Sequence, residues 1–110
     1  MKVYTFLTDG FETVEALAVI DILRRAGIEV ETVSITGNEQ VCSAQNITVK
    51  ADTLFKAQPV CKEDVLFLPG GPGHKQYNEC KPLLKLLEKH HAEGGRIAAI
   101  CAAPSILGHL

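Results

Sequence analysis

One cysteine stands where a reactive thiol is expected. Cys101 follows the apolar run of residues 96–100 and precedes small residues that can begin a helix. A side chain at such a strand-to-helix corner lies at the carboxyl end of a sheet, where backbone N–H groups and the helix dipole favour a thiolate over a thiol. Cys101 is therefore predicted to be a nucleophile or a redox-sensitive residue. The alternative is a buried cysteine that only fills space, because free cysteine is among the most buried residue types.

Two glutamates early in the first predicted helix, Glu12 and Glu15, could act on this thiol. A protonated carboxyl beside a cysteine donates a hydrogen bond that stabilises the thiolate and lowers the pKa of the thiol. Early helical acids also compensate the helix dipole, and spacing alone does not choose between the two residues.

The glycine-rich residues 69–73 predict a tight turn after a strand. A glycine N–H of this turn, paired with the N–H of Ala102, could bind a developing oxyanion. The segment lacks the G-x-x-x-x-G-K-[ST] and G-x-G-x-x-G patterns of phosphate-binding loops, which argues against a nucleotide site.

No histidine in the sequence is a convincing catalytic base for the cysteine. His90 and His91 are predicted at the exposed end of a helix, in contact with solvent. His109 lies two helical turns past Cys101, about 12 Å along the axis, which is too far. His74 follows the glycine-rich turn and is the histidine that could approach the site.

The hydrophobic pattern predicts an open α/β sheet. Strands are expected at residues 2–8, 29–34, 64–68 and 96–100, helices at 12–26, 82–93 and about 103–110, and a small antiparallel pair at 40–43 and 47–51. The alternation of strands and helices implies parallel pairing, in the order 2-1-3-4 with one further edge strand possible. Ligands of such sheets bind beyond the carboxyl ends of the strands, where the loops after strands one, three and four meet.

The composition is that of an ordinary globular domain. The 110 residues suffice for one core, and 46% hydrophobic with 22% charged residues argues against disorder. A net charge of -2 gives no electrostatic reason to expect nucleic acid or an anionic membrane as a partner. No apolar run approaches the length of about 20 residues that spans a bilayer.

Cysteine usage bears on cofactors and on compartment. The four cysteines form neither a C-x-x-C pair nor a zinc-binding pattern, so no metal site is expected. No organic cofactor is indicated by the sequence either. The N-terminal apolar run is too short for a signal peptide, which favours the reducing cytoplasm over a disulfide-linked secreted protein.

Several short motifs together resemble the ThiJ/PfpI superfamily, in the branch of the Parkinson-disease-associated protein and its bacterial relatives. They run in family order over nearly the whole chain: GFETVEA at residues 10–16, DILRRAGI at 21–28, VCS at 41–43, LPGG at 68–71 and AAICAAP at 98–104. Each motif is weak alone, and the set is specific. The resemblance implies a flavodoxin-like open parallel sheet sandwiched by helices, the N-terminal portion of a fold like that of class I glutamine amidotransferases.

The resemblance also implies roles for individual residues. It matches Glu15, rather than Glu12, with the acid that stabilises the Cys101 thiolate. It matches Gly71 and Ala102 with the two N–H groups of the oxyanion hole.

Outside the catalytic residues, the resemblance bears on assembly and chain length. Asp21 and Arg25 match residues at or near a subunit interface beside the active site, so a homodimer is expected, and Cys42 matches a secondary cysteine that is not the nucleophile. Family members are much longer, and their site histidine falls beyond Leu110. Residues 1–110 are therefore expected to be a single ThiJ/PfpI-type domain truncated on its C-terminal side, with the missing segment a candidate separate chain.

The function implied by the resemblance is that of a cysteine-dependent stress-response enzyme in the cytoplasm. The Cys101 thiolate would act on a small ketoaldehyde or its protein adduct, as a glyoxalase-like or deglycase-like hydro-lyase or hydrolase. The alternative from another class is a redox-sensing or chaperone-like protein that is oxidised at Cys101 without substrate turnover. An amidase or peptidase of the PfpI type is disfavoured, because the protease-like branch has histidine where this chain has Ala102.

Overall fold

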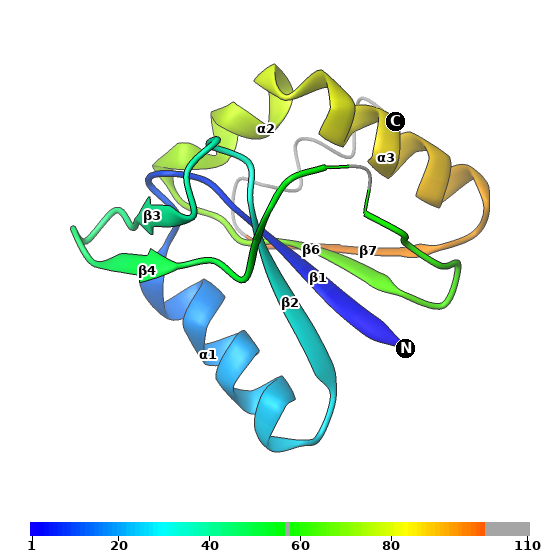
Figure 1. Cartoon of the computed structure of the whole chain (residues 1–110), viewed down its shortest axis with the longest axis horizontal. Helices are drawn as coiled ribbons and strands as arrows, with labels where there is room; N and C mark the ends of the chain where they lie inside the picture. Colours follow the sequence, from blue (N-terminus) through cyan, green and yellow to red (C-terminus); the bar gives the residue numbers. More distant parts are fainter. Residues whose placement is uncertain (57, 101–110) are drawn as a thin grey trace.

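A computed structural model describes residues 1–56 and 58–100 of the chain (Figure 1). The strands are β1 (Lys2–Leu7), β2 (Glu29–Ser34), β3 (Gln40–Cys42), β4 (Thr48–Lys50), β5 (Thr53–Leu54), β6 (Val65–Leu68) and β7 (Arg96–Ala99). The helices are α1 (Thr13–Arg25), α2 (Lys75–Glu79) and α3 (Lys81–Ala92), with a 3₁₀ turn, η1, at Pro72–His74. The helix predicted at residues 103–110 lies outside the described residues.

Five parallel strands form the main sheet, in the order β5-β2-β1-β6-β7. The predicted order 2-1-3-4 is confirmed, and β5 is the further edge strand. The small pair β3 and β4 is antiparallel, as predicted, with Val41 opposite Val49. An isolated bridge between Phe11 and Ser43 joins this pair to the loop after β1.

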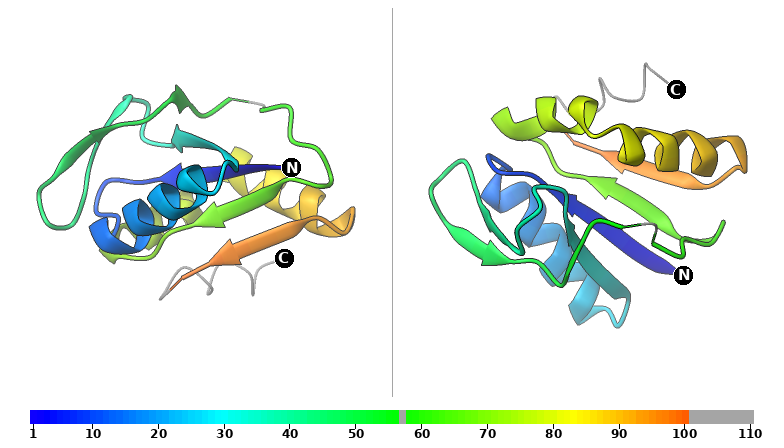
Figure 2. Two further views of the ribbon diagram at one scale, coloured as in Figure 1. Left: turned by 90° about the horizontal axis from the view of Figure 1, so that it is seen from below. Right: turned by 45° about the horizontal axis from the view of Figure 1, so that its top comes forward.

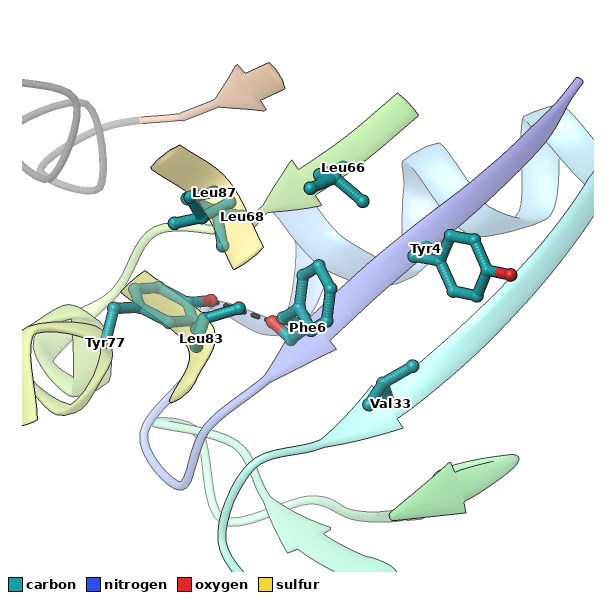
Figure 3. Close-up of a cluster of buried hydrophobic side chains, with 8 residues drawn as sticks. All are labelled: Tyr4, Phe6, Val33, Leu66, Leu68, Tyr77, Leu83 and Leu87. Atoms are coloured by element: carbon teal, nitrogen blue, oxygen red, sulfur yellow. Dashed lines mark hydrogen bonds between the residues drawn. The ribbon is translucent and has the colours of Figure 1, made fainter. Parts of the chain in front are cut away.

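Helices cover both faces of the sheet (Figure 2). Alternate residues of β1 point to opposite faces, as in any strand. Tyr4 and Phe6 pack with Tyr77, Leu83 and other side chains of the α2 and α3 face, in the cluster drawn in Figure 3. On the other face, Val3 packs with Ile20 of α1, Val30 and Phe67. Two apolar layers therefore hold β1 at the centre of the molecule.

The ends of α1 follow from the sequence around them. Glu15 lies in the first turn and Arg24 and Arg25 in the last, an order that suits the helix dipole. Gly27 has a φ of 79°, so it supplies the left-handed conformation that ends helices. Ala16 and Ile20 are buried, whereas Val14 and Ile22 are 73% and 65% exposed.

The prediction that His90 is solvent-exposed was wrong, although His91 is exposed as predicted. His90 is only 3% exposed, and its Nε2 atom lies 2.9 Å from the carbonyl oxygen of Asp64. The reason is that the end of α3 packs beside the start of β6, with the ring of His90 against the backbone of Gly95.

In the part of the chain that the structure describes, no helix is long and apolar enough to cross a membrane.

Candidate functional site

The loops that follow β1 and β6 meet at the carboxyl end of the sheet, as predicted. The N–H of Glu12 donates to Gly70 O at 2.9 Å, and the N–H of Gly73 donates to Gly10 O at 3.1 Å. A Cβ atom at Gly71 would lie 2.6 Å from both the Glu12 nitrogen and the Gly10 oxygen. The two loops are therefore in direct main-chain contact, which only glycine permits here.

The end of β7 lies beside the end of β6. Ala99 pairs with Leu68, and the N–H of Ile100 donates to Leu68 O at 3.2 Å. Cys101 is the next residue in the sequence, and both Cys101 and Ala102 lie outside the described residues. The last described residue before the predicted nucleophile thus lies at the same end of the sheet as the two glycine-containing loops.

Gly71 has a φ of 113°, a conformation that side-chain-bearing residues rarely adopt. Its carbonyl accepts a hydrogen bond from the His74 N–H at 3.0 Å and lies 3.0 Å from His74 Nδ1. Among the described residues the Gly71 N–H has no acceptor. This N–H could serve an oxyanion, and the role remains a prediction.

The two candidate glutamates differ in what they do. Glu12 is the residue before α1, and its main chain ties that helix to Gly70. Glu15 lies in the first turn of α1, its side chain is half-buried, and its Oε1 atom is shielded from solvent. A half-buried carboxyl at this end of the sheet fits the role expected of Glu15.

A set of polar contacts that the sequence did not reveal holds the start of α1. Thr13 Oγ1 lies 2.6 Å from Ser43 Oγ and 2.8 Å from Gln45 Oε1, and the N–H of Gly10 donates to Cys42 O at 2.8 Å. These contacts join residues about 30 positions apart, so local spacing carries no signal for them beyond the VCS motif itself. They fix the position of the helix that carries Glu15.

Among the remaining candidate residues, Asp21 and Arg25 lie away from the two loops, and His74 lies beside them. Asp21 and Arg25 form an exposed ion pair of 2.9 Å on α1, at 61% and 79% side-chain exposure. They are more than one helical turn beyond Glu15, about 9 Å or more along the axis. His74 is half-buried next to Gly71, as its sequence position suggested. His109 lies outside the described residues.

Cys42, Cys61 and Cys80 are all free thiols. The Cys42 N–H donates to Asp9 Oδ1 at 3.0 Å, and its Sγ is 3.6 Å from Ser43 O, so Cys42 braces the loop after β1. Within the described ranges, no group of three or more His, Cys, Asp or Glu residues is arranged to hold a metal ion.

The family model of the DJ-1/PfpI family matches residues 1–109. The chain belongs to this family. It is 38% identical over 106 residues to protein DJ-1 homolog B of Arabidopsis thaliana, a match that covers 96% of this chain and 24% of that protein. It is also 32% identical over 96 residues to the Caenorhabditis elegans protein named glutathione-independent glyoxalase DJR-1.2, covering 87% of this chain and 51% of that protein.

The solved structure of Toxoplasma gondii DJ-1, described as oxidised, superposes with a TM-score of 0.88 at 37% identity. That match covers 96% of this chain and 58% of the other, so the chain spans about half the length, or less, of these relatives. The predicted family and the flavodoxin-like parallel fold are both confirmed.

Proposed function

We propose that the chain carries the cysteine site of a DJ-1-type stress-response enzyme that acts on small ketoaldehydes or their protein adducts. The observation that carries this proposal is the meeting of three segments at one end of the sheet: the loop after β1 at Glu12, the turn after β6 at Gly70 and Gly71, and Ile100, which directly follows β7. Support at family level comes from the C. elegans relative that is named a glyoxalase.

In the proposed reaction, the Cys101 thiolate attacks the aldehyde carbon of the substrate. A C–S bond forms, the C=O π electrons move to oxygen, and the alkoxide takes up a proton to give a hemithioacetal. The N–H groups of Gly71 and Ala102 stabilise the alkoxide while it carries charge. The protonated carboxyl of Glu15 donates a hydrogen bond to the thiolate before attack. Later proton transfers fall to Glu15 or to a histidine that the resemblance places beyond Leu110.

Methylglyoxal consumption tests the proposal. We expect Cys101→Ser to abolish consumption and Cys61→Ser, a matched change at an exposed cysteine, to leave it unchanged. Equal rates in the wild type and in Cys101→Ser would contradict the assignment of the nucleophile.

The role of Glu15 is tested by alkylation of Cys101 as a function of pH, followed by peptide mass mapping. Glu15→Leu removes the hydrogen-bond donor and is expected to raise the pKa of the Cys101 thiol. Glu15→Gln keeps an N–H donor and is expected to raise it less. Each unit of increase corresponds to about a tenfold loss of thiolate at neutral pH, and an unchanged profile in Glu15→Leu would refute the role.

Redox sensing at Cys101 is the second candidate function. It is favoured by the T. gondii relative, whose structure is described as oxidised. Brief treatment with about one equivalent of peroxide should then add oxygen to Cys101 before the exposed Cys61, because thiolates react faster than thiols. Selective oxidation without methylglyoxal consumption would favour the sensor over the enzyme, and oxidation of Cys61 first would count against both.

A homodimer in the cytoplasm completes the proposal. The outer side of α1 exposes Val14, Ala18 and Ile22 at helical spacing, next to the Asp21–Arg25 ion pair. A second copy of the chain would bury this apolar stripe. Light scattering should give a dimer mass that Ile22→Glu reduces to the monomer, and a monomer of the wild type at micromolar concentration would contradict the proposal.

A further inference from the structure

A hollow of about 510 Å³ lies between α3 and the segment that follows β5. Its apolar residues are Phe55, Pro82 and Leu86, and its cationic residues are Lys56, Lys85 and Lys89. None of these residues belongs to the proposed cysteine site. The volume falls in the range of about 300–1,000 Å³ that is typical of cavities for small molecules.

The apolar floor of the hollow is an extension of the protein core. The Phe55 ring lies 6.0 Å from the ring of Phe6, centroid to centroid, at a tilt of 57°. Leu86 and Phe55 both pack against the buried cluster beneath α3. A floor held in this way is in place before a ligand arrives, which reduces the entropy cost of binding.

The wall that follows β5 is also held by hydrogen bonds. Gln58 Nε2 donates to Leu54 O at 3.0 Å, and Gln58 Oε1 accepts from the Lys56 N–H at 3.1 Å. The Gln58 side chain therefore ties Leu54 and Lys56 of this segment together. The segment runs beside α3, with which it lines the hollow (Figure 1).

The charge of the hollow has one sign. Three lysines line it and no acid does, and none of the three forms an ion pair with another described residue. Lys85 and Lys89 are four residues apart on one helix, a spacing at which like charges repel. The acids that follow them in sequence do not line the hollow. Glu93 lines a smaller neighbouring cavity of about 60 Å³, which Lys89 also lines, so the hollow itself is lined by positive charge alone.

We propose that this hollow binds an organic anion with an apolar body, specifically a medium-chain carboxylate. The apolar chain would lie on Phe55 and Leu86, and the carboxylate would lie among the ammonium groups. From Pro82 to Lys89, α3 rises by about 10 Å, which is similar to the extended length of octanoate. A cation of the same length would meet three like charges, and an uncharged alcohol would lose the electrostatic contribution.

The test is a titration of the ¹⁵N-labelled chain with octanoate, followed by amide chemical shifts. We expect saturable shifts at Phe55, Leu86 and Lys89, and affinity that falls with added salt. Octylammonium should give no such shifts. The double variant Lys85→Glu/Lys89→Glu should bind octanoate at least about tenfold more weakly. The control is Lys81→Glu, a change of the same charge on α3 outside the hollow, which should bind like the wild type.

Three results would overturn the proposal: no saturable shifts in the wild type, equal weakening in Lys81→Glu and the double variant, or equal shifts with octylammonium. If the double variant fails to fold, as judged by circular dichroism, Lys85→Gln/Lys89→Gln takes its place and should weaken binding in the same direction. A change in oligomeric mass caused by the lysine changes, without octanoate binding, would show that a second copy covers the hollow instead, and would also refute the proposal.

Discussion

The hydroxyl of Tyr77 links the two segments that bear the candidate site. Tyr77 lies on α2 and is fully buried, and its hydroxyl is 2.8 Å from Phe6 O (Figure 3). The same hydroxyl is 3.1 Å from Pro69 O. A hydrogen bond contributes about 1 kcal/mol net, and a buried polar group left without its partner costs about 1–3 kcal/mol. Tyr77→Phe removes only the oxygen. We therefore expect it to lower the free energy of unfolding by about 1–3 kcal/mol.

Urea denaturation followed by far-ultraviolet circular dichroism measures this loss. Tyr4→Phe is the matched control, because Tyr4 is also buried but its hydroxyl donates to no main-chain carbonyl of the described residues. We expect the control to lose less stability than Tyr77→Phe. A loss below about 0.5 kcal/mol in Tyr77→Phe, or equal losses in both variants, would refute the bracing role of the hydroxyl.

The same phenol makes stability depend on alkaline pH. Burial raises the pKa of Tyr77 well above its ordinary value, because the phenolate would lack water. The folded state therefore keeps this proton at a pH where the unfolded state releases it. Its contribution is fully present below about pH 10, the unfolded value, and is lost as the pH rises further. Tyr77→Phe should lose stability less steeply above pH 10 than the wild type, and Tyr4, whose pKa burial also raises, accounts for part of the remaining slope.

Further changes test the backbone contacts around the site. Gly71→Ala should lower the free energy of unfolding by about 1–3 kcal/mol through its positive φ, and by more because the new methyl group collides with the opposite loop. Gly27→Ala, also at positive φ but with open space around it, should lower it less when both variants are compared by thermal unfolding. Gly95→Ala should cost about 1–3 kcal/mol, because the added methyl group meets the His90 ring. In a double-mutant cycle, His90→Ala should remove part of that cost, and additive losses would contradict the contact. Thr13→Val should cost about 1 kcal/mol by loss of its hydroxyl contacts, and an unchanged denaturation midpoint would show that they do not stabilise α1.

The strand order was predictable from the sequence because it depends on local patterns and on general rules of connection. Apolar runs marked each main strand, and the alternation with helices required parallel pairing. Parallel strands end together, so the meeting of the loops after β1 and β6 followed from topology alone. A further edge strand was anticipated, but its residues were not, because β5 is only two residues long. The helix α2 was not predicted, because it follows a Gly-Pro-rich turn that obscures helical periodicity.

The environment of individual side chains could not be predicted in the same way. His90 lies near a helix end with charged neighbours in sequence, which describes an exposed residue. Its burial depends on the Asp64 carbonyl, 26 positions away. The contact between Thr13 and Ser43 spans 30 positions and depends on the fold bringing the β3 segment to the start of α1. Such contacts follow only once the tertiary structure is known.

The close main-chain contacts between the loops at the carboxyl end of the sheet indicate which kind of charge the proposed site could stabilise. Gly10, Gly71 and Gly73 pack so tightly that a Cβ atom at any of them would press on the opposite loop. Apart from the hydroxyl of Thr8, the nearest atoms that such a Cβ would meet are backbone atoms, and a backbone N–H held by packing needs no reorganisation when negative charge develops beside it. A reaction that builds positive charge would gain nothing from such donors. The N–H groups of Gly10 and Gly73 already donate to Cys42 O and Gly10 O, so among the described residues it is the Gly71 N–H that this packing leaves for the proposed oxyanion.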